Sequence, residues 1–497
     1  MSGFYRASLI KLFLICLTAV LLRITEGYFV VVMVIVGCVA ALFGRNSLAL
    51  GCYFILPLFA VANPVILPIS GIYIVVERIG FVVFTIVFLL RGRDSGRQRI
   101  PILSIFIYLF CAVFSSMNGY MPQISYLKIL NMAFFVIGLY MVGTKISHHE
   151  KIAIFMREFV FAIVVLIVFG SLFTLLVPHA AYYVSVSSVL RTEGVAAADQ
   201  ILSDRMNGLF CGIVYQSQAL APILVCIFVW IVCDFIVIQR GRGVLHIILI
   251  FIMPYLMYLT RSRTALLSLF VGILMILIYF LPRVNLSRKL KKRAISYVIT
   301  GFICLVTAGI IMEMRGNGLT KWIRKVDDVQ ADDRSMTEAF TASRLGRIEE
   351  CLYDFRKNPL LGMGFQVNMW TPIDYRNGDV SLLSAPVEKG FVPAMILGEG
   401  GIVGAIAFVL FLLIFYHKCA LKQYHITIVM FTVYLSTNLA EATIFSPGGV
   451  GGILWIICLF GGFILDMTQK GILQASVMLV YPNSMSNHES AIGYNRV

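Results

Sequence analysis

The sequence predicts an all-α polytopic membrane protein with about 12–14 transmembrane helices and one large extracytoplasmic loop subdomain. Three observations support this fold class: 60% of the 497 residues are hydrophobic, only 13% are charged, and the mean hydropathy is +0.91. Soluble domains are about 45–50% apolar and about 25% charged, so a soluble core would not absorb this excess. The apolar runs, roughly 16–25 residues each, fit helices that cross a bilayer and are too long for barrel strands.

Apolar stretches divide the chain into candidate spans. Fourteen are expected, near 8–22, 28–43, 47–62, 70–90, 100–116, 126–143, 152–176, 209–238, 244–260, 264–282, 294–312, 391–416, 425–445 and 450–466. The first three are short, and two of them could merge or re-enter the membrane, so twelve is the lower bound. Arg6 and Lys11 precede the first stretch as in a signal peptide, but no A-x-A cleavage site follows, so we expect a retained span.

The distribution of basic residues predicts the orientation. With a cytoplasmic N-terminus, the cytoplasmic loops hold seventeen Lys/Arg: Arg45, Arg91, Arg93, Arg97, Arg99, Lys145, Lys151, Arg240, Arg242, Arg283, Arg288, Lys289, Lys291, Lys292, Arg293, Lys418 and Lys422. The short outer loops hold five: Arg23, Arg191, Arg205, Arg261 and Arg263. This imbalance is the positive-inside pattern, and it also argues that the net charge of +15 does not reflect nucleic-acid binding.

The predicted organisation has four parts: helices 1–11 over 1–312, an extracytoplasmic subdomain over 313–390, helices 12–14 over 391–466 and a cytoplasmic tail over 467–497. The subdomain carries eleven Lys/Arg and twelve Asp/Glu. A capping box at Ser335–Glu338 predicts a helix to about Lys357, with Leu345, Ile348, Leu352 and Phe355 on one face. Long loops of this kind usually carry function.

Metal and disulfide chemistry are not expected. Most of the eleven cysteines lie inside apolar segments, and no C-x-x-C or other metal-ligand spacing occurs. One acidic D-D-x-x-x-D-D cluster lies in the large loop, at Asp327, Asp328, Asp332 and Asp333. Such a cluster either holds a divalent cation or is an ordinary acidic loop, and we favour the second interpretation, with no metal and no cofactor.

Arginines at the predicted outer boundary are the main candidates for an anion site. Arg261 and Arg263 flank one serine between two spans, and Arg205 lies at the mouth of another span. Arg344 and Arg347 are spaced i, i+3 on the predicted loop helix, so they point the same way. A guanidinium forks onto phosphate oxygens and stays charged at any working pH. The alternatives are snorkelling at the interface for Arg261 and Arg263, and a solvated face for Arg344 and Arg347.

Polar residues in or near the spans are weaker candidates. Glu388, just before the twelfth span, could act as a general base, although a carboxylate also suits a helix N-terminus. Tyr215, Gln216 and Gln218 fall inside the eighth predicted span, where hydrogen bonding between helices explains them. Glu441 falls inside the thirteenth, where a structural hydrogen bond and a functional role remain open.

Four short patterns carry a resemblance to a known family. Thr260-Arg261-Ser262-Arg263-Thr264-Ala265-Leu266 is similar to the T-x-S-R-x-A-L signature of the O-antigen polymerase and O-antigen ligase superfamily. Ser343-Arg344 followed by Asn358-Pro359-Leu360-Leu361-Gly362-Met363-Gly364 resembles its S-R … N-P-L-x-G-x-G. Glu399 to Gly404 resembles E-x-G-x-x-G, and Arg205 to Gly208 resembles R-x-x-G. The resemblance covers roughly 200–410, in the family's order.

This resemblance implies a membrane enzyme that works without a metal on polyprenyl-diphosphate-linked glycans at the outer face of a bacterial inner membrane. By position it implicates Arg205, Arg263 and Arg344 in binding the diphosphate. In the ligases a histidine of an H-N pair shortly before E-x-G is proposed to activate the acceptor. Here Glu388-Lys389 stands in that region and the whole outer loop lacks histidine, which favours a polymerase.

The sequence therefore predicts a multi-pass glycosyltransferase that polymerises lipid-linked repeat units into an O-antigen, capsule or exopolysaccharide. Its expected partners are the lipid-linked oligosaccharide, the bilayer and a chain-length regulator, with no nucleic acid. Within the expected site, Glu388 and Arg263 are assigned catalysis, and Arg205, Arg261, Arg344 and Arg347 are assigned substrate binding. The alternatives are an O-antigen ligase and a lipid-linked oligosaccharide flippase, although a flippase would show two related halves and the chain has no such repeat.

Overall fold

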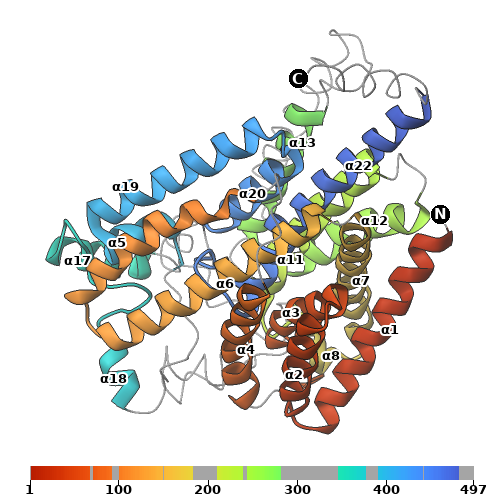
Figure 1. The fold of residues 1–497 in the computed structure, drawn as a ribbon. Coiled ribbons are helices and arrows are strands. Elements are labelled where there is room, and N and C mark those ends of the chain that lie inside the picture. The colour runs from red at the N-terminus through yellow and green to blue at the C-terminus, as the bar shows by residue number, and fades with distance from the viewer. Residues whose placement is uncertain are drawn as a thin grey trace, which may run out of the picture.

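The computed structural model describes residues 2–67, 71–91, 100–148, 150–182, 210–238, 243–280, 345–376, 390–439 and 441–480 (Figure 1). These residues form helices joined by short turns, and strand-like pairing among them is limited to one antiparallel bridge between Ala62 and Val214. The predicted all-α class of a polytopic membrane protein is confirmed.

Seven described helices are long and apolar enough to cross a membrane. The first six are α1 (Ser2–Ile24), α4 (Gly71–Leu90), α6 (Pro122–His148), α7 (Glu150–Thr174), α11 (Ser217–Cys233) and α19 (Val392–Leu421). Helix α11 is continued by the π-helical segment η2 (Asp234–Ile238). The seventh is continuous through three parts: α21 (Gly449–Leu454), the π-helical η5 (Trp455–Gly461) and α22 (Gly462–Val480).

Six shorter apolar helices complete the described bundle: α2 (Phe29–Leu42), α3 (Asn46–Ala60), η1 with α5 (Pro101–Ile105 and Phe106–Met117), α12 (Val244–Leu259), α13 (Arg263–Phe280) and α20 (His425–Thr437). Each of the long and the shorter apolar helices overlaps one predicted span. The eleventh predicted span, 294–312, lies outside the described residues. The first three stretches form separate helices, so the merged alternative is wrong. Three short helices lie between spans: α8 (Pro178–Ala181), α17 (Leu345–Lys357) and α18 (Thr371–Arg376).

One end of the bundle holds the family-like patterns that the structure describes, and we call it the motif end. It consists of residues 61–67, 118–121, 174–182, 210–216, 259–263, 358–366, 398–404, 438–439 and 441–449. Backbone hydrogen bonds join these segments: the N–H of Tyr215 donates to the carbonyl of Val61 at 3.0 Å, and that of Tyr120 donates to the carbonyl of Met363 at 3.2 Å. These bonds join the segments in two groups, and the loop 441–449 contacts both, through Gln366 to Phe445 and through Gly449 to Val61.

Asn63 organises part of the motif end. Its buried side-chain amide donates to the carbonyls of Ala180 at 2.6 Å and Gly212 at 2.9 Å, and its backbone N–H donates to the carbonyl of Ile213 at 2.8 Å. Since buried peptide carbonyls need donors, one asparagine satisfies two of them and ties the ends of α3, α8 and α11 together.

The opposite end of the bundle holds a buried charge network between four helices. Asp234 accepts hydrogen bonds from Arg157 Nε at 2.6 Å and Nη2 at 3.0 Å, and lies 2.8 Å from His246 Nε2. His246 Nδ1 in turn lies 3.1 Å from the hydroxyl of Tyr5. Because the guanidinium, the carboxylate and the imidazole are all buried, their mutual pairing is what makes their burial tolerable.

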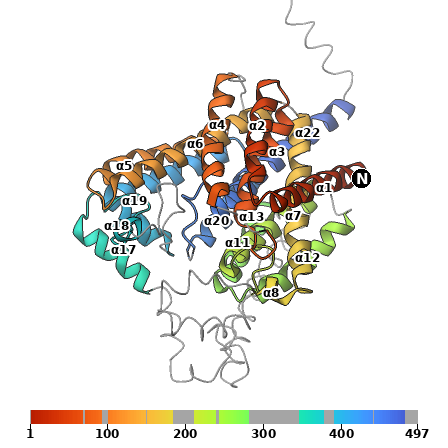
Figure 2. The ribbon, with the colours of Figure 1, turned by 90° about the horizontal axis from the view of Figure 1, so that it is seen from below.

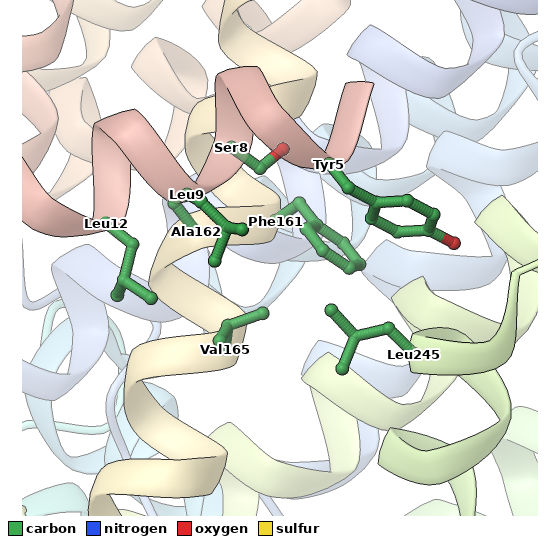
Figure 3. A pocket seen from close by; sticks show the side chains of 8 residues that line it. All are labelled: Tyr5, Ser8, Leu9, Leu12, Phe161, Ala162, Val165 and Leu245. Atoms are coloured by element: carbon green, nitrogen blue, oxygen red, sulfur yellow. The ribbon is translucent and has the colours of Figure 1, made fainter. Parts of the chain in front are cut away.

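A small cavity of about 30 Å³ lies beside this network, between α1, α7 and α12 (Figure 3). Its lining is almost entirely apolar, with Leu9 and Leu12 from α1, Val165 from α7 and Leu245 from α12. None of the family-like patterns contributes to it.

The two perpendicular views separate the molecule into two sides. Figures 1 and 2 both place α5, α17 and α19 on one side and α1, α7 and α12 on the other. On the first side α19 packs against α5 and α17, and on the second α7 packs against α1 and α12.

Candidate functional site

Helix α19 is broken near its start, at Gly401. This glycine has φ +61° and ψ −159°, so the helical hydrogen bonds across it cannot form. The break leaves the carbonyls of Gly398 and Glu399 without helical donors and the N–H groups of Ile402 and Val403 without helical acceptors. Inside an apolar bundle these four peptide groups need other partners.

The segment Pro359–Gly364 supplies all four partners. The N–H of Met363 donates to the carbonyl of Gly398 at 2.9 Å, and that of Gly364 to the carbonyl of Glu399 at 3.2 Å. In the other direction, the N–H of Ile402 donates to Pro359 at 2.9 Å and that of Val403 to Leu360 at 3.2 Å. The two patterns N-P-L-x-G-x-G and E-x-G-x-x-G are therefore the two halves of one backbone junction.

Two glycines make this close approach possible. A Cβ on Gly401 would lie 2.3 Å from the carbonyl oxygen of Leu360, and one on Gly362 would lie 2.4 Å from the carbonyl carbon of Glu399. Both glycines also have positive φ, +61° and +70°, which side-chain-bearing residues rarely adopt. The junction thus requires glycine at both positions and fixes residues 359–364 of the large loop onto α19.

Helix α17 is anchored beside this junction. Cys351 and Asp354 are its buried residues, and Asp354 accepts a hydrogen bond of 2.6 Å from the hydroxyl of Tyr120, between α5 and α6. Burial, followed by the hydrogen bond to Asp354, raises the pKa of Tyr120, so Tyr120 stays a neutral donor. At Gly398 a Cβ would lie 2.8 Å from the carbonyl oxygen of Cys351, so α17 packs directly on the backbone of α19.

The loop between α20 and α21 meets the junction through Gln366. The side-chain amide of Gln366 donates to the carbonyl of Phe445, and the backbone carbonyl of Gln366 accepts a hydrogen bond of 3.0 Å from Lys128 Nζ on α6. Lys128 is only 6% exposed. A buried cation therefore lies next to Gln366 of the large loop, at the motif end of α6.

The arginine-rich pattern forms a tight turn between α12 and α13. Arg261 has φ +50°, a left-handed conformation that costs a non-glycine residue about 1–2 kcal/mol. Arg263 is the first residue of α13 and is half-buried. The turn is tied to the rest of the motif end, because the N–H of Phe210 donates to the carbonyl of Leu259 at 3.4 Å. Two guanidinium groups thus originate from one strained turn at a helix boundary.

A comparison with family models bears on this segment. Residues 248–409 match the O-antigen ligase family. The match begins in α12, includes the Arg261–Arg263 turn, α17 and the junction, and ends within α19. It supports the O-antigen ligase and polymerase superfamily and a role in surface glycan assembly, and it does not separate ligase from polymerase. No curated protein matches the chain.

The structure describes only part of the predicted site. Arg261 and Arg263 share one turn, and the backbone of Arg347 lies in α17, which packs on α19. Arg205, Arg344 and Glu388 lie outside the described residues, as does the acidic cluster. The roles assigned to these residues therefore remain predictions.

Several sequence predictions at the motif end need correction. Helix α11 begins at Ser217, so Tyr215 and Gln216 precede it in an extended segment, where Gln216 donates to Gln218 at 3.1 Å. Helix α20 ends at Thr437, so Glu441 lies in the following loop. The cause is Asn438, whose side-chain oxygen accepts from the N–H groups of Thr443 and Ile444 at 2.8 Å each and turns the chain.

The face of α17 is also rotated from the prediction. Its deepest residues are Cys351 and Asp354, while Ile348, Leu352 and Phe355 are half-buried. The apolar periodicity predicted that the apolar residues form the buried face. An aspartate in such a pattern is expected to face solvent, but Asp354 is buried because it pairs with Tyr120. The end at Lys357, before Asn358-Pro359, is as predicted.

Several buried charged residues inside spans were not among the predicted candidates, including Arg157 and Asp234 of the network described above. Glu77 and Arg78 on α4 are 1% and 6% exposed, and Lys128 on α6 is buried to the same degree as Arg78. The signal was present, because ionisable residues within apolar stretches are functional candidates by default.

Proposed function

We propose that the protein polymerises polyprenyl-diphosphate-linked oligosaccharide repeat units into a bacterial surface polysaccharide at the outer face of the inner membrane. The observation that carries this proposal is the Arg261–Arg263 turn, which lies at a span boundary inside the segment that matches the O-antigen ligase family. Paired guanidinium groups supply forked, charge-assisted hydrogen bonds to phosphate oxygens.

The reaction needs charge stabilisation on a leaving diphosphate. The bond between the anomeric carbon of the donor glycan and its diphosphate oxygen breaks, and the acceptor hydroxyl forms a new glycosidic bond to that carbon. The hydroxyl proton passes to a base, for which we propose Glu388, and polyprenyl diphosphate leaves. Arg263 would stabilise the leaving charge, with Arg205, Arg261, Arg344 and Arg347 completing the anion site.

The connected motif end supports a site at the bilayer surface. We propose that this end faces the extracytoplasmic side, that 313–390 forms the extracytoplasmic subdomain and that 467–497 is cytoplasmic, because seventeen basic loop residues fall on the other side. The glycine junction would hold the large loop over the arginine-bearing layer. A chain-length regulator is a proposed partner only.

An O-antigen ligase is the second candidate, and the description of the matching family favours it. Against it stands the absence of histidine from 313–390 in the sequence, where the ligase-like pattern expects one. The glycan banding pattern of a deletion strain separates the two. Single capped repeat units on the lipid core would support the polymerase, whereas long lipid-linked chains that never become attached would overturn it in favour of a ligase.

A further inference from the structure

A buried arginine on α4 stands at the same end of the bundle as the proposed site. Arg78 lies seven residues after the start of α4, or about 10 Å along the helix at 1.5 Å per residue. It is 6% exposed, and its neighbour Glu77 is 1% exposed. An arginine at this depth is costly unless it is paired or binds a ligand.

Glu77 balances the charge of Arg78 but accepts no hydrogen bond from its Nε. The distance from Arg78 Nε to Glu77 Oε2 is 4.0 Å, which is too long for a hydrogen bond. Consecutive residues on a helix do not face each other, and Glu77 Oε1 instead accepts from the N–H of Gly449 at 3.3 Å. Within the described residues Arg78 Nε has no hydrogen-bond acceptor.

Gly448 leaves room for the guanidinium. A Cβ at this glycine would lie 2.7 Å from Arg78 Cζ and 2.9 Å from both terminal nitrogens. The backbone of Gly448 is extended, with φ −110° and ψ 176°, so glycine is not required there for conformational reasons. The absence of a side chain at Gly448 matters because a Cβ there would clash with the guanidinium of Arg78.

The loop that carries Gly448 is held in place independently of Arg78. Ser446 Oγ donates to the carbonyl of Gly448 at 3.0 Å, and the Asn438 side chain fixes the residues before it. This loop reaches Gln366 through Phe445 on one side. On the other side a Cβ on Gly449 would lie 3.7 Å from Val61, whose carbonyl accepts from Tyr215. Arg78 is therefore built into the motif end, together with the glycine junction and the segment that contacts the Arg261–Arg263 turn.

We propose that Arg78 is the anchor of a second oxyanion site, which binds the diphosphate of the second lipid-linked substrate. This inference rests on the proposed polymerase function, because that reaction uses two substrates that each carry a polyprenyl diphosphate. The Arg261–Arg263 turn holds one diphosphate between α12 and α13, and Arg78 holds the other on α4. The buried guanidinium, charge-balanced by Glu77 but with an unused donor, needs an oxygen acceptor to be satisfied.

The test measures how many undecaprenyl diphosphate molecules bind to each purified chain in phosphatidylcholine nanodiscs. We expect two for the wild-type chain, one for Arg78→Gln, one for Arg263→Gln and none for the double variant. At the affected site the affinity should fall about 10- to 100-fold, as for loss of hydrogen bonds to a charged group. Gly448→Ala, which pushes a methyl group into the guanidinium, should weaken the same site as Arg78→Gln.

A matched control is Gly51→Ala on α3, where the added Cβ would meet Phe159 at an ordinary 3.7 Å and both sites should remain. Two molecules bound to both Arg78→Gln and Gly448→Ala would overturn the proposal. One molecule on the wild-type chain, lost only in Arg263→Gln, would overturn the second site and leave the proposed function intact. Loss in Arg78→Gln alone, with Arg263→Gln unaffected, would support the Arg78 site and contradict the role of Arg263.

The phosphate of a bilayer lipid is the other source of an oxyanion. Nanodiscs that contain phosphatidylglycerol distinguish it, because the proposal predicts that this lipid does not displace undecaprenyl diphosphate from the Arg78 site. Displacement that depends on Arg78 would assign the site to a lipid headgroup and overturn the substrate assignment. Arg78→Lys provides a conservative variant, and it should keep the fold while losing most of the forked binding.

Discussion

Replacing Gly401 by alanine tests whether the two glycine patterns form a structural junction. The φ and ψ of Gly401 cost a non-glycine residue about 1–3 kcal/mol. In addition, the new methyl group would lie 2.3 Å from the carbonyl oxygen of Leu360, so the segment 359–364 must move away. Four backbone hydrogen bonds cross this junction, each worth about 1 kcal/mol. Losing two of them with the backbone strain gives a destabilisation of about 3–5 kcal/mol.

Gly404→Ala is the matched control, three residues further along the same helix. Its Cβ would meet only Tyr108 at 3.7 Å and Ile396 at 3.8 Å, and alanine in a helix interior is favoured over glycine by about 0.5–1 kcal/mol. Thermal unfolding of the detergent-solubilised protein should therefore shift down for Gly401→Ala and stay level or shift up for Gly404→Ala. Trypsin should also cut the large loop faster in Gly401→Ala. Equal melting temperatures and equal cleavage rates would refute the junction.

Three further predictions follow from the proposed topology, the proposed chemistry and the buried charges. A cysteine at Leu360, which is 64% exposed, should react on intact cells with a maleimide that cannot cross the membrane, and labelling only after lysis would overturn the orientation. Polymerisation in isolated membranes should survive EDTA and the joint replacement by asparagine of Asp327, Asp328, Asp332 and Asp333, whereas inhibition restored by magnesium would assign the acidic cluster a metal. Asp234→Ala should lower the free energy of unfolding by about 3–5 kcal/mol because it leaves Arg157 and His246 buried without their acid, and an unchanged melting temperature would show that water already reaches them.

Most of the fold was predictable because the bilayer imposes a simple rule. Every peptide group within hydrocarbon must be bonded inside its own segment, so apolar length alone located the helices. The breaks in this rule were not predictable. Nothing in the apolar pattern of 391–416 shows that α19 is interrupted at Gly401, because its freed peptide groups bond to residues some 40 positions earlier in the sequence.

The same reasoning explains the errors at helix ends. Asn438 and Asn63 end or connect elements through side-chain bonds to distant backbone groups, and such bonds leave no periodic trace in the sequence. Of the site, the sequence located the Arg261–Arg263 turn as a pair. It did not indicate Arg78, because the partners that reveal it, Gly448 and Gly449, come from the far end of the chain.

The central claim is that Arg263 binds the leaving diphosphate, and replacing it by lysine tests this most directly. Lysine keeps the charge but cannot reproduce the forked pair of hydrogen bonds. An effect of about 2–4 kcal/mol on the transition state would slow polymerisation roughly 30- to 1000-fold. Arg23→Lys is the control, because Arg23 is exposed and donates to the carbonyl of Ile66, a bond that lysine can also make.

The measurement is the rate of polysaccharide formation in membranes that contain equal amounts of each variant. We expect Arg263→Lys to insert normally and to make little or no long polysaccharide, while Arg23→Lys matches the wild-type protein. If Arg263→Lys made full-length polysaccharide as fast as Arg23→Lys, Arg263 would be only an interface anchor, and the claim would be contradicted.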